Sequence, residues 1–194
     1  MFGTLMLFAV PAVLFRLLGA FGVGRFGSWR VSVLHGLAVM LVFTAGAHFV
    51  PSALGPMPGH HDLAAMVPPF VPFPRLAVYA TGVLELLGAA GLIRETTRPT
   101  AGLGLAALFV LMLPANIHAA VEQIPLNGET ATPLWFRIPE QVVFIGVALW
   151  AYVPARAASA HRAGGVPAWT SFRDGSASGG LTPPSPPHGS TTGD

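Results

Sequence analysis

The chain has 194 residues, of which 53% are hydrophobic and only 9% are charged. Soluble domains of this size carry about a quarter charged residues, so the composition excludes an ordinary soluble domain and indicates a small integral membrane protein. It contains no cysteine, which excludes disulfide exchange and thiolate metal sites. The net charge is +2, and the arginines form no cluster of the kind that binds nucleic acid.

The first apolar segment, residues 2–23, is interrupted by Pro11 and Arg16. It lacks the basic start and the small-residue cleavage site of a signal peptide, so we expect an uncleaved helix that spans the membrane or lies along its interface. Further apolar segments follow, each with about the 20 residues that a spanning helix needs: 31–50, 76–93, 101–121 and 134–153. The predicted fold class is all-α, a polytopic membrane four-helix bundle over residues 31–153 with an additional N-terminal apolar helix and basic linker in 1–30.

The arginines predict the orientation of these helices. If the four strong segments alternate in direction, one side holds seven arginines and the other side holds Arg75 and a segment with Glu122 and Glu129. The seven are Arg25, Arg30, Arg94, Arg98, Arg156, Arg162 and Arg173. Because basic residues favour the cytoplasmic side, we expect this side, including a disordered tail over 154–194 rich in Gly, Ser and Pro, to be cytoplasmic. The expected location is the inner membrane of a bacterium.

Glu85 is the most informative polar residue of the apolar segments. An ionised carboxylate at the centre of a membrane helix costs about 2.5–3.5 kcal/mol, and such residues usually face the bundle interior. Its neighbours one turn away are all small, which marks a packing face: Thr81, Gly82, Gly88 and Ala89. This face leaves room for a partner side chain or a ligand. The alternative is a neutral glutamic acid that is hydrogen-bonded only for packing.

Seven polar groups are expected in the outer half of the bundle: His48, Glu85, Asn116, His118, Arg137, Glu140 and Gln141. We interpret them as candidate lining residues of one ligand pocket, in which a histidine beside a glutamate carries protons. The alternative for each histidine is a surface residue at the membrane interface. Below them, the inner half offers only His35 and Thr44.

The partners within this group are left open by the sequence. Glu140, Glu122 or Glu85 could pair with Arg137, and Glu85 would connect the second and fourth segments. His118 and Glu122, four residues apart, share a helix face. Two alternatives exist for Pro114, which frees the carbonyl of residue 110. It either rotates the last turn so that Asn116 and His118 face one cavity, or it merely bends the helix while Asn116 bonds to backbone across an interface.

Metal and haem sites have weak support. Adjacent residues such as His60, His61 and Asp62 rarely converge on one ion, so no metal site is expected. We expect Asp62 instead to cap a short helix, in a loop that lies against the membrane surface. His48 and His118 lie at similar depth on different helices and could ligate one haem. His35 and His48 lie 13 residues apart on one helix, but the inner site has no second histidine, so haem is not expected.

Several stretches, in this order, resemble the DoxX family of small bacterial membrane proteins: TAGAHFVP, MVPPFVPFPRLAVYATGVLELLGAAGL, LPANIHAAVE and LWFRIPEQVVFIGVALWAY. The resemblance covers roughly residues 31–153 and implies a four-helix membrane bundle. The family shares its name with subunits of a thiosulfate:quinone oxidoreductase, and some members associate with redox-stress proteins. His48, Glu85, Asn116 and Gln141 occupy motif positions without agreed catalytic roles. The N-terminal segment and the tail depart from the family pattern.

The function expected from these observations is a redox-associated membrane subunit whose pocket receives a lipoquinone head group. The chain has no cysteine and no flavin motif, so it is not expected to be an enzyme on its own. Electron transfer would require a soluble or membrane redox partner. The alternatives are a small-solute or proton permease, or a structural membrane scaffold. No covalent cofactor is expected.

Overall fold

The computed structural model describes residues 2–51, 58–126, 128 and 132–153, and these form an all-α protein. The helices are α1 (Gly3–Ala20), the short 3-10 helix η1 (Gly24–Phe26), α2 (Trp29–Ala47), α3 (His60–Met66), α4 (Pro74–Ile93), α5 (Arg98–Val121) and α6 (Leu134–Tyr152). Residues 154–194, for which we expect a cytoplasmic tail, and Glu129 lie outside the described residues.

Five of these helices (α1, α2, α4, α5 and α6) are long and apolar enough to cross a membrane. With 18–24 residues each, they extend about 27–36 Å, close to the thickness of the hydrocarbon core. Large apolar side chains such as Leu87, Leu111 and Val142 are more than 60% exposed on the outside of the bundle. A surface of this kind is expected against lipid and would aggregate in water, so the helices indicate a membrane protein.

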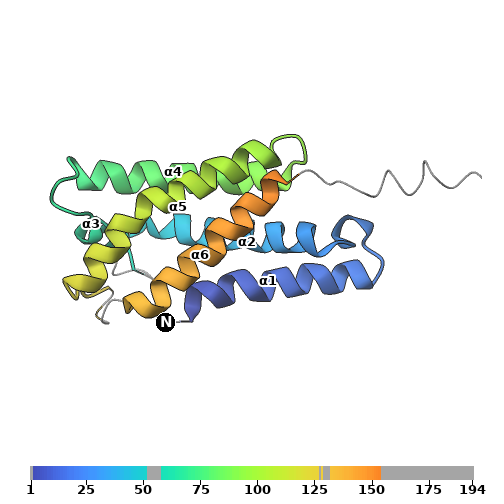
Figure 1. Ribbon diagram of the computed structural model, residues 1–194, viewed down its shortest axis with the longest axis horizontal. Coiled ribbons are helices and arrows are strands. Elements are labelled where there is room, and N and C mark those ends of the chain that lie inside the picture. Colours follow the sequence, from blue (N-terminus) through green and yellow to red (C-terminus); the bar gives the residue numbers. More distant parts are fainter. Residues whose placement is uncertain (1, 52–57, 127, 129–131, 154–194) are drawn as a thin grey trace, which may run out of the picture. The chain divides into compact units, whose positions relative to one another are not determined.

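The long helices run in alternating directions between two ends of the bundle (Figure 1). One end, called the α3 end here, carries α3 and the first turns of α1, α4 and α6. The opposite end, called the arginine end, carries the α1–α2 and α4–α5 turns with Arg25, Arg30, Arg94 and Arg98. The four predicted spans are confirmed as helices, with boundaries shifted by up to three residues.

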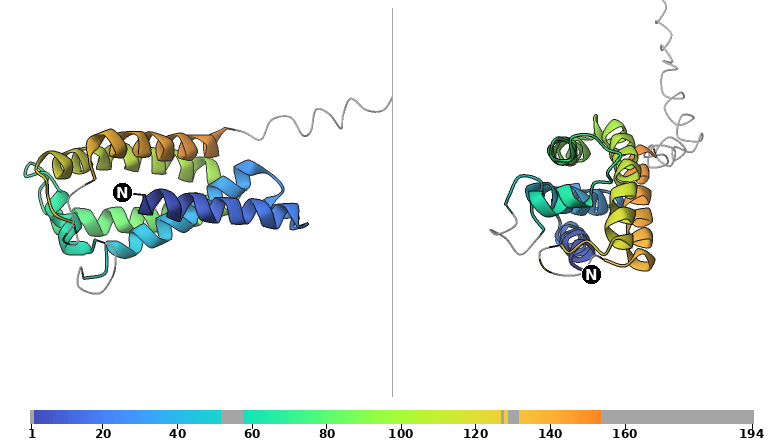
Figure 2. Two further views of the ribbon diagram at one scale, coloured as in Figure 1. Left: turned by 90° about the horizontal axis from the view of Figure 1, so that it is seen from below. Right: turned by 90° about the vertical axis from the view of Figure 1, so that its left-hand side faces the viewer.

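Helix α2 is the central element of the bundle, since it packs against α1, α4 and α6, while α5 packs between α4 and α6 (Figure 2). Helix α1 lies antiparallel beside α2. Gly36 permits this contact because a Cβ there would lie 2.7 Å from the Cβ of Ala12 and 2.8 Å from the carbonyl oxygen of Phe8. The N-terminal helix therefore belongs to the same compact unit as the four-helix bundle.

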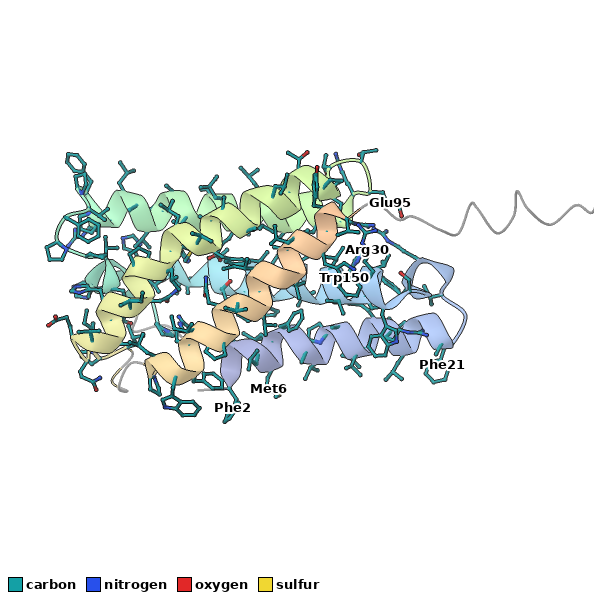
Figure 3. The ribbon with its side chains drawn as sticks, viewed as in Figure 1. Phe2, Met6, Phe21, Arg30, Glu95 and Trp150 are labelled. Carbon is teal, nitrogen blue, oxygen red and sulfur yellow. The ribbon has the colours of Figure 1, made fainter. Side chains whose placement is uncertain are left out.

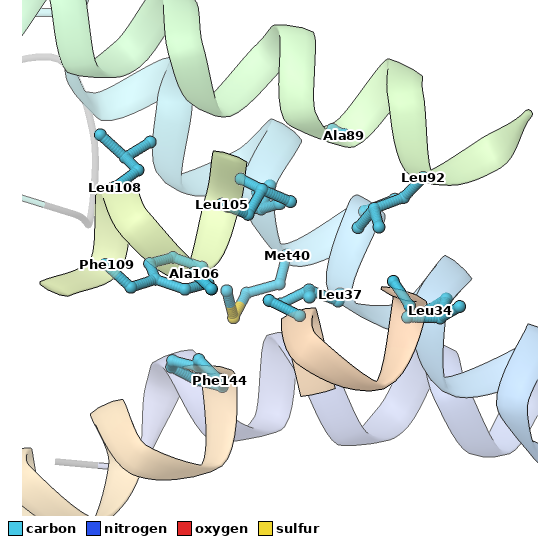
Figure 4. Packing of buried hydrophobic residues seen from close by; sticks show 14 residues of the cluster. Leu34, Leu37, Met40, Ala89, Leu92, Leu105, Ala106, Leu108, Phe109 and Phe144 are labelled. Atoms are coloured by element: carbon cyan, nitrogen blue, oxygen red, sulfur yellow. The ribbon is translucent and has the colours of Figure 1, made fainter. Parts of the chain in front are cut away.

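The apolar core fills the half of the bundle toward the arginine end (Figure 4). Its largest fully buried side chains on α2 are Leu34, Leu37 and Leu41, which meet Leu92 of α4 and Leu105 of α5. The buried polar residues of the described part lie on either side of it: Ser32, His35 and Arg98 toward the arginine end, and His48, Glu85, Asn116, Glu140 and Gln141 toward the α3 end.

Helix α3 packs against α4 and α5 at the α3 end. Met66 is buried against Ala119, with Leu63 and Ala115 beside them. The helix begins at His60, and the carboxylate of Asp62 accepts a hydrogen bond from the Gly59 N–H at 3.0 Å. Asp62 thus stabilises the start of a short helix as expected, but from within its first turn and not from the position before it.

Candidate functional site: two buried polar groups

The polar residues predicted to line one pocket form two groups on different helix pairs. His48 and Glu85 meet between α2 and α4. Asn116, Arg137 and Glu140 meet between α5 and α6. Within the described ranges, no hydrogen bond or ion pair connects one group to the other. Their hydrogen bonds and ion pairs are therefore made within two local arrangements, and the single pocket expected from sequence stays a prediction.

His48 is positioned by the backbone of α4. It follows the last residue of α2, and its Nδ1 lies 2.7 Å from the carbonyl oxygen of Val78. A carbonyl only accepts, so Nδ1 carries the hydrogen and Nε2 is left to exchange a proton. The hydroxyl of Thr81, 3.1 Å from the same Nδ1, donates to Val78 as well. The ring orientation is thereby fixed, with Nε2 directed at Glu85.

Glu85 is only 3% exposed and has one partner on each carboxylate oxygen. Oε2 lies 2.9 Å from the Thr44 hydroxyl, and Oε1 lies 3.6 Å from His48 Nε2. Thr44 also reaches the carbonyl of Leu41 at 3.2 Å, so its single hydrogen can be given to either acceptor. Thr44 therefore suits both states of Glu85: it donates to a carboxylate, or it accepts from a carboxylic acid and donates to Leu41.

The chemical capacity of this pair is the storage of one proton. Placing the proton on Nε2 gives an ion pair, and placing it on the carboxylate gives two neutral groups. A separation of 3.6 Å is too long for a hydrogen bond between the two, so neither atom is saturated by the other. A ligand oxygen that bound here would break no hydrogen bond of this pair.

The small-residue face around Glu85 is filled by protein side chains. At Gly82, an added Cβ would lie 2.6 Å from the Cβ of His48, and at Gly88 it would overlap the side chain of Leu105. Ala89 is buried in the core cluster, and Thr81 bonds to His48 and Val78. Of the two occupants expected for this face, a partner side chain or a ligand, the structure shows the partner side chains.

His60 of α3 covers the end of this arrangement. Its Nδ1 donates to the carbonyl of His48 at 2.8 Å, and its ring stacks on Tyr79 with centroids 4.1 Å apart. His61, the next residue, is exposed, and Asp62 bonds to Gly59. The three adjacent residues thus serve different purposes. No group of three or more potential metal ligands occurs among the residues that the structure describes.

In the second group, Arg137 binds Asn116 and Glu140. Its Nε and Nη2 donate to Asn116 Oδ1 at 3.2 and 3.0 Å, and its Nη1 donates to Glu140 Oε2 at 3.0 Å. Of the acids considered from sequence, the local one is the partner. Glu85 does not reach Arg137, because His48 and Thr44 hold it on the opposite helix pair. The other oxygen of Glu140, Oε1, is buried without a partner.

Gln141 binds the backbone of α5 near Pro114. Its Nε2 donates to the carbonyl of Phe109 at 2.9 Å, five residues before Pro114 and one before the carbonyl expected to be free. Asn116 bonds to a side chain of α6, which differs from both sequence alternatives, since it neither joins His118 nor bonds to backbone. The residues around Pro114 therefore connect α5 to α6.

His118 and Glu122 do not form the expected pair. His118 is half-buried, Glu122 is exposed, and neither a hydrogen bond nor an ion pair joins their described side chains. His48, the other histidine at this depth, has Nδ1 bonded to Val78 and Nε2 facing Glu85. Haem ligation by His48 would require this pair to separate, and the geometry does not favour it.

His35 lies on the far side of the apolar core. It is buried, its Nδ1 bonds to the carbonyl of Val31 at 2.8 Å, and Phe15 and Phe26 pack edge-on against its ring. Thr44, the other polar residue expected in this half, belongs to the Glu85 arrangement. Between His35 and Thr44, the side chains of Leu37 and Leu41 are fully buried; we call them, with the core residues around them, the apolar layer.

Comparison with known proteins gives a family but no activity. Residues 37–152, more than half of the chain, match the family model of a domain of unknown function, DUF8561. The chain belongs to the DUF8561 family. Neither a curated protein nor a solved structure matches it.

The DUF8561 region contains both polar groups in full. It begins within α2 at Leu37 and ends at the last residue of α6, so it includes Thr44, His48 and Glu85 as well as the Arg137 group. Helix α1 and the first turns of α2 precede it. The two polar groups are therefore features of the four-helix part, and α1 is an addition that packs on α2.

Two participants in the DUF8561 site were not recognised from sequence. Thr44 was interpreted as an isolated inner residue, although it stands four positions before His48 on the same helix face. That spacing could have identified it. His60 was considered only as a metal ligand, and its contact with the His48 carbonyl depends on the path of a loop that no local pattern predicts.

Proposed function

We propose that the protein is a DoxX-like, redox-associated subunit of a bacterial inner membrane that receives a lipoquinone head group at His48 and Glu85. The observation that carries the proposal is the buried His48–Glu85 pair, whose Nε2 and Oε1 face each other at 3.6 Å without a hydrogen bond and have the capacity to share one proton. Intramembrane ionisable residues generally mark functional sites. The resemblance to DoxX suggests the redox association, and DUF8561 membership itself carries no activity.

The chemistry of a quinone fits this pair. A quinone carbonyl oxygen accepts a hydrogen bond, and a quinol hydroxyl donates one, so the head group needs a partner that can do either. His48 Nε2 and Glu85 Oε1 can exchange these roles by moving one proton. Because side chains occupy the spaces at Gly82 and Gly88, the isoprenoid tail would lie on the lipid-facing side of α4, where Val83 and Leu87 are exposed.

Electron transfer in this proposal belongs to a soluble or membrane partner. The chain has no cysteine, and the described part of it contains no cluster of three or more side chains that could hold a metal ion. The protein would therefore position and protonate the quinone without being an enzyme on its own. The arginine end would face the cytoplasm, supported by four arginines there against exposed Arg75 at the α3 end.

The test is quinone retention by the full-length protein in mild detergent. Quinone is extracted and measured by a reduced-minus-oxidised ultraviolet spectrum for the wild type, Glu85→Gln and His48→Phe. Glu122→Gln, an exposed acid near the α3 end, is the matched control. We expect quinone in the wild type and control, and at least a tenfold loss in both site variants. Equal quinone content in all four proteins would refute the assignment of the site.

A structural scaffold is the second candidate, favoured by one observation: Arg137 of α6 binds both Asn116 of α5 and Glu140 of α6, and so connects the two helices. A scaffold predicts that Glu85→Gln lowers the melting temperature and leaves cellular function intact. The permease alternative is less favoured, because the apolar layer separates His35 from Thr44. Solute uptake by proteoliposomes would distinguish a permease from both.

A further inference from the structure

Three arginines from three different elements meet at the arginine end of the bundle. Arg25 of η1 donates to the carbonyl of Ile93 at 3.2 Å, and Arg98 of α5 donates from Nε to the carbonyl of Leu92 at 3.0 Å. Arg30 of α2 donates to the carbonyl of Ala151 at 2.9 Å. Each guanidinium thus donates from one nitrogen to a carbonyl in the last turn of α4 or α6. Its other N–H groups remain available to another acceptor.

The positive charge at this end exceeds the negative charge near it. Among the described residues, the C-terminal ends of α1, α4 and α6 each contribute about half a negative charge at this end, and the N-terminal ends of α2 and α5 each contribute about half a positive charge. Glu95 is the acid that lies with the arginines in the described α4–α5 turn. Its negative charge attracts Arg98, whereas the positive charges of Arg25 and Arg30 repel Arg98. Arg94, which is exposed, adds a fourth positive group. An unneutralised positive charge therefore remains.

One of these guanidinium groups also has an unsatisfied donor. Arg30 Nε is buried and has no hydrogen-bond partner, although Nη2 of the same side chain binds Ala151. A buried N–H without an acceptor is unfavourable, so an external acceptor that drew the Arg30 side chain slightly outward and accepted from Nε would be stabilising. Phosphate oxygens suit the planar fork of arginine, which can donate two parallel hydrogen bonds.

The depth of this end indicates which phosphate is present. Trp150 of α6 and Trp29 of α2 are 41% and 57% exposed, and tryptophan prefers the level of the lipid head groups. Figure 3 shows Arg30 and Trp150 at the same end of the bundle as Glu95. At this depth the phosphates of the surrounding lipids are the abundant acceptors.

We propose that the arginine end binds the phosphate of an anionic phospholipid through Arg25, Arg30 and Arg98, beside the exposed indole of Trp150. This site is independent of the quinone site, since it lies on the other side of the apolar layer and involves none of the residues of the polar groups. It assigns these arginines a ligand in addition to their helix-end carbonyls.

Native mass spectrometry of the full chain in mild detergent tests the proposal. Phosphatidylglycerol and phosphatidylcholine are added in separate titrations; both contain a phosphate, but only the first is anionic. The variants are Arg25→Gln, whose side chain is exposed, and the double variant Arg25→Gln, Arg30→Gln. Arg75→Gln at the α3 end makes the same change of charge at another exposed arginine and is the control.

We expect the wild type to prefer phosphatidylglycerol, with about fivefold weaker binding for each arginine removed near the anionic surface. Affinity should also fall as salt is raised, because partly exposed charges are screened. Arg75→Gln should bind like the wild type. Equal binding of both lipids, an equal loss in Arg75→Gln, or complete displacement by excess inorganic phosphate would overturn the lipid assignment.

Discussion

The contact between Gly82 and His48 gives the sharpest prediction, for the substitution Gly82→Ala. The new Cβ would lie 2.6 Å from the His48 Cβ and 2.9 Å from its Cγ. Because carbon atoms pack at about 3.5–4.0 Å, α2 and α4 must move apart by about 1 Å at this point. The closer of the two atoms is the His48 Cβ, which does not move when the side chain rotates, so a change of rotamer cannot relieve the clash.

The expected loss of stability follows from two contributions. Overpacking of a filled site costs about 1–3 kcal/mol. A displacement of this size also breaks the 2.7 Å bond between His48 Nδ1 and the Val78 carbonyl, which costs about 0.5–1.5 kcal/mol. Together we expect Gly82→Ala to lower the free energy of unfolding by about 1.5–4.5 kcal/mol.

The assay is reversible unfolding in mixed detergent micelles, followed by tryptophan fluorescence and circular dichroism. Gly146→Ala is the matched control, because a Cβ on that glycine of α6 meets nothing within 4 Å. Its stability should not fall, and should rise by up to about 1 kcal/mol, because alanine favours a helix over glycine. If Gly82→Ala were as stable as Gly146→Ala, the close approach of α2 and α4 and the fixed orientation of His48 would both be refuted.

Two further predictions concern α6. Arg137→Met should destabilise the protein by about 3–5 kcal/mol, because it leaves Glu140 buried without its partner. Adding Glu140→Gln to this variant should restore part of the lost stability in the same unfolding assay. If Arg137→Met alone caused no loss of stability, Glu140 would not be charged beside Arg137. Gln141→Leu removes the donor to the Phe109 carbonyl and should lower the free energy of unfolding by about 1–3 kcal/mol. Val142→Leu, on the lipid-facing side, should leave stability nearly unchanged. Similar effects of the two substitutions would refute a role for this bond.

Much of the fold could be predicted from sequence because the bilayer makes it a problem of length and hydropathy. Each of the four strong segments became a helix, and the weaker segment with Pro11 became α1. A helix satisfies its own backbone within the membrane, so an apolar run of about 20 residues has few alternatives. The boundaries were shifted where capping residues such as Ser28, outside the apolar run, start a helix earlier.

The site was predicted only in part, because residue types and depths do not specify which helices are neighbours. All of the named polar residues except His118 are buried or hydrogen-bonded, as their cost in a membrane requires. Sequence could not show that Glu85 faces His48 and not Arg137, since this depends on α4 packing beside α2 and away from α6. Nor could it show that the spaces beside Gly82 and Gly88 are already filled.

The apolar layer has an electrical consequence. His35 and Thr44 are nine positions apart along α2, about 13 Å of helix, and the buried apolar side chains of the apolar layer between them form a region of low dielectric constant. In a chain that spans the membrane, most of the transmembrane potential falls across such a region. A charge that crosses the whole membrane changes its energy by about 2.3 kcal/mol per 100 mV. The His48–Glu85 pair lies on the α3 side of this layer, so a proton that reaches it from the α3 end crosses little of the voltage. Its protonation should therefore respond to the pH at that surface and hardly at all to the membrane potential.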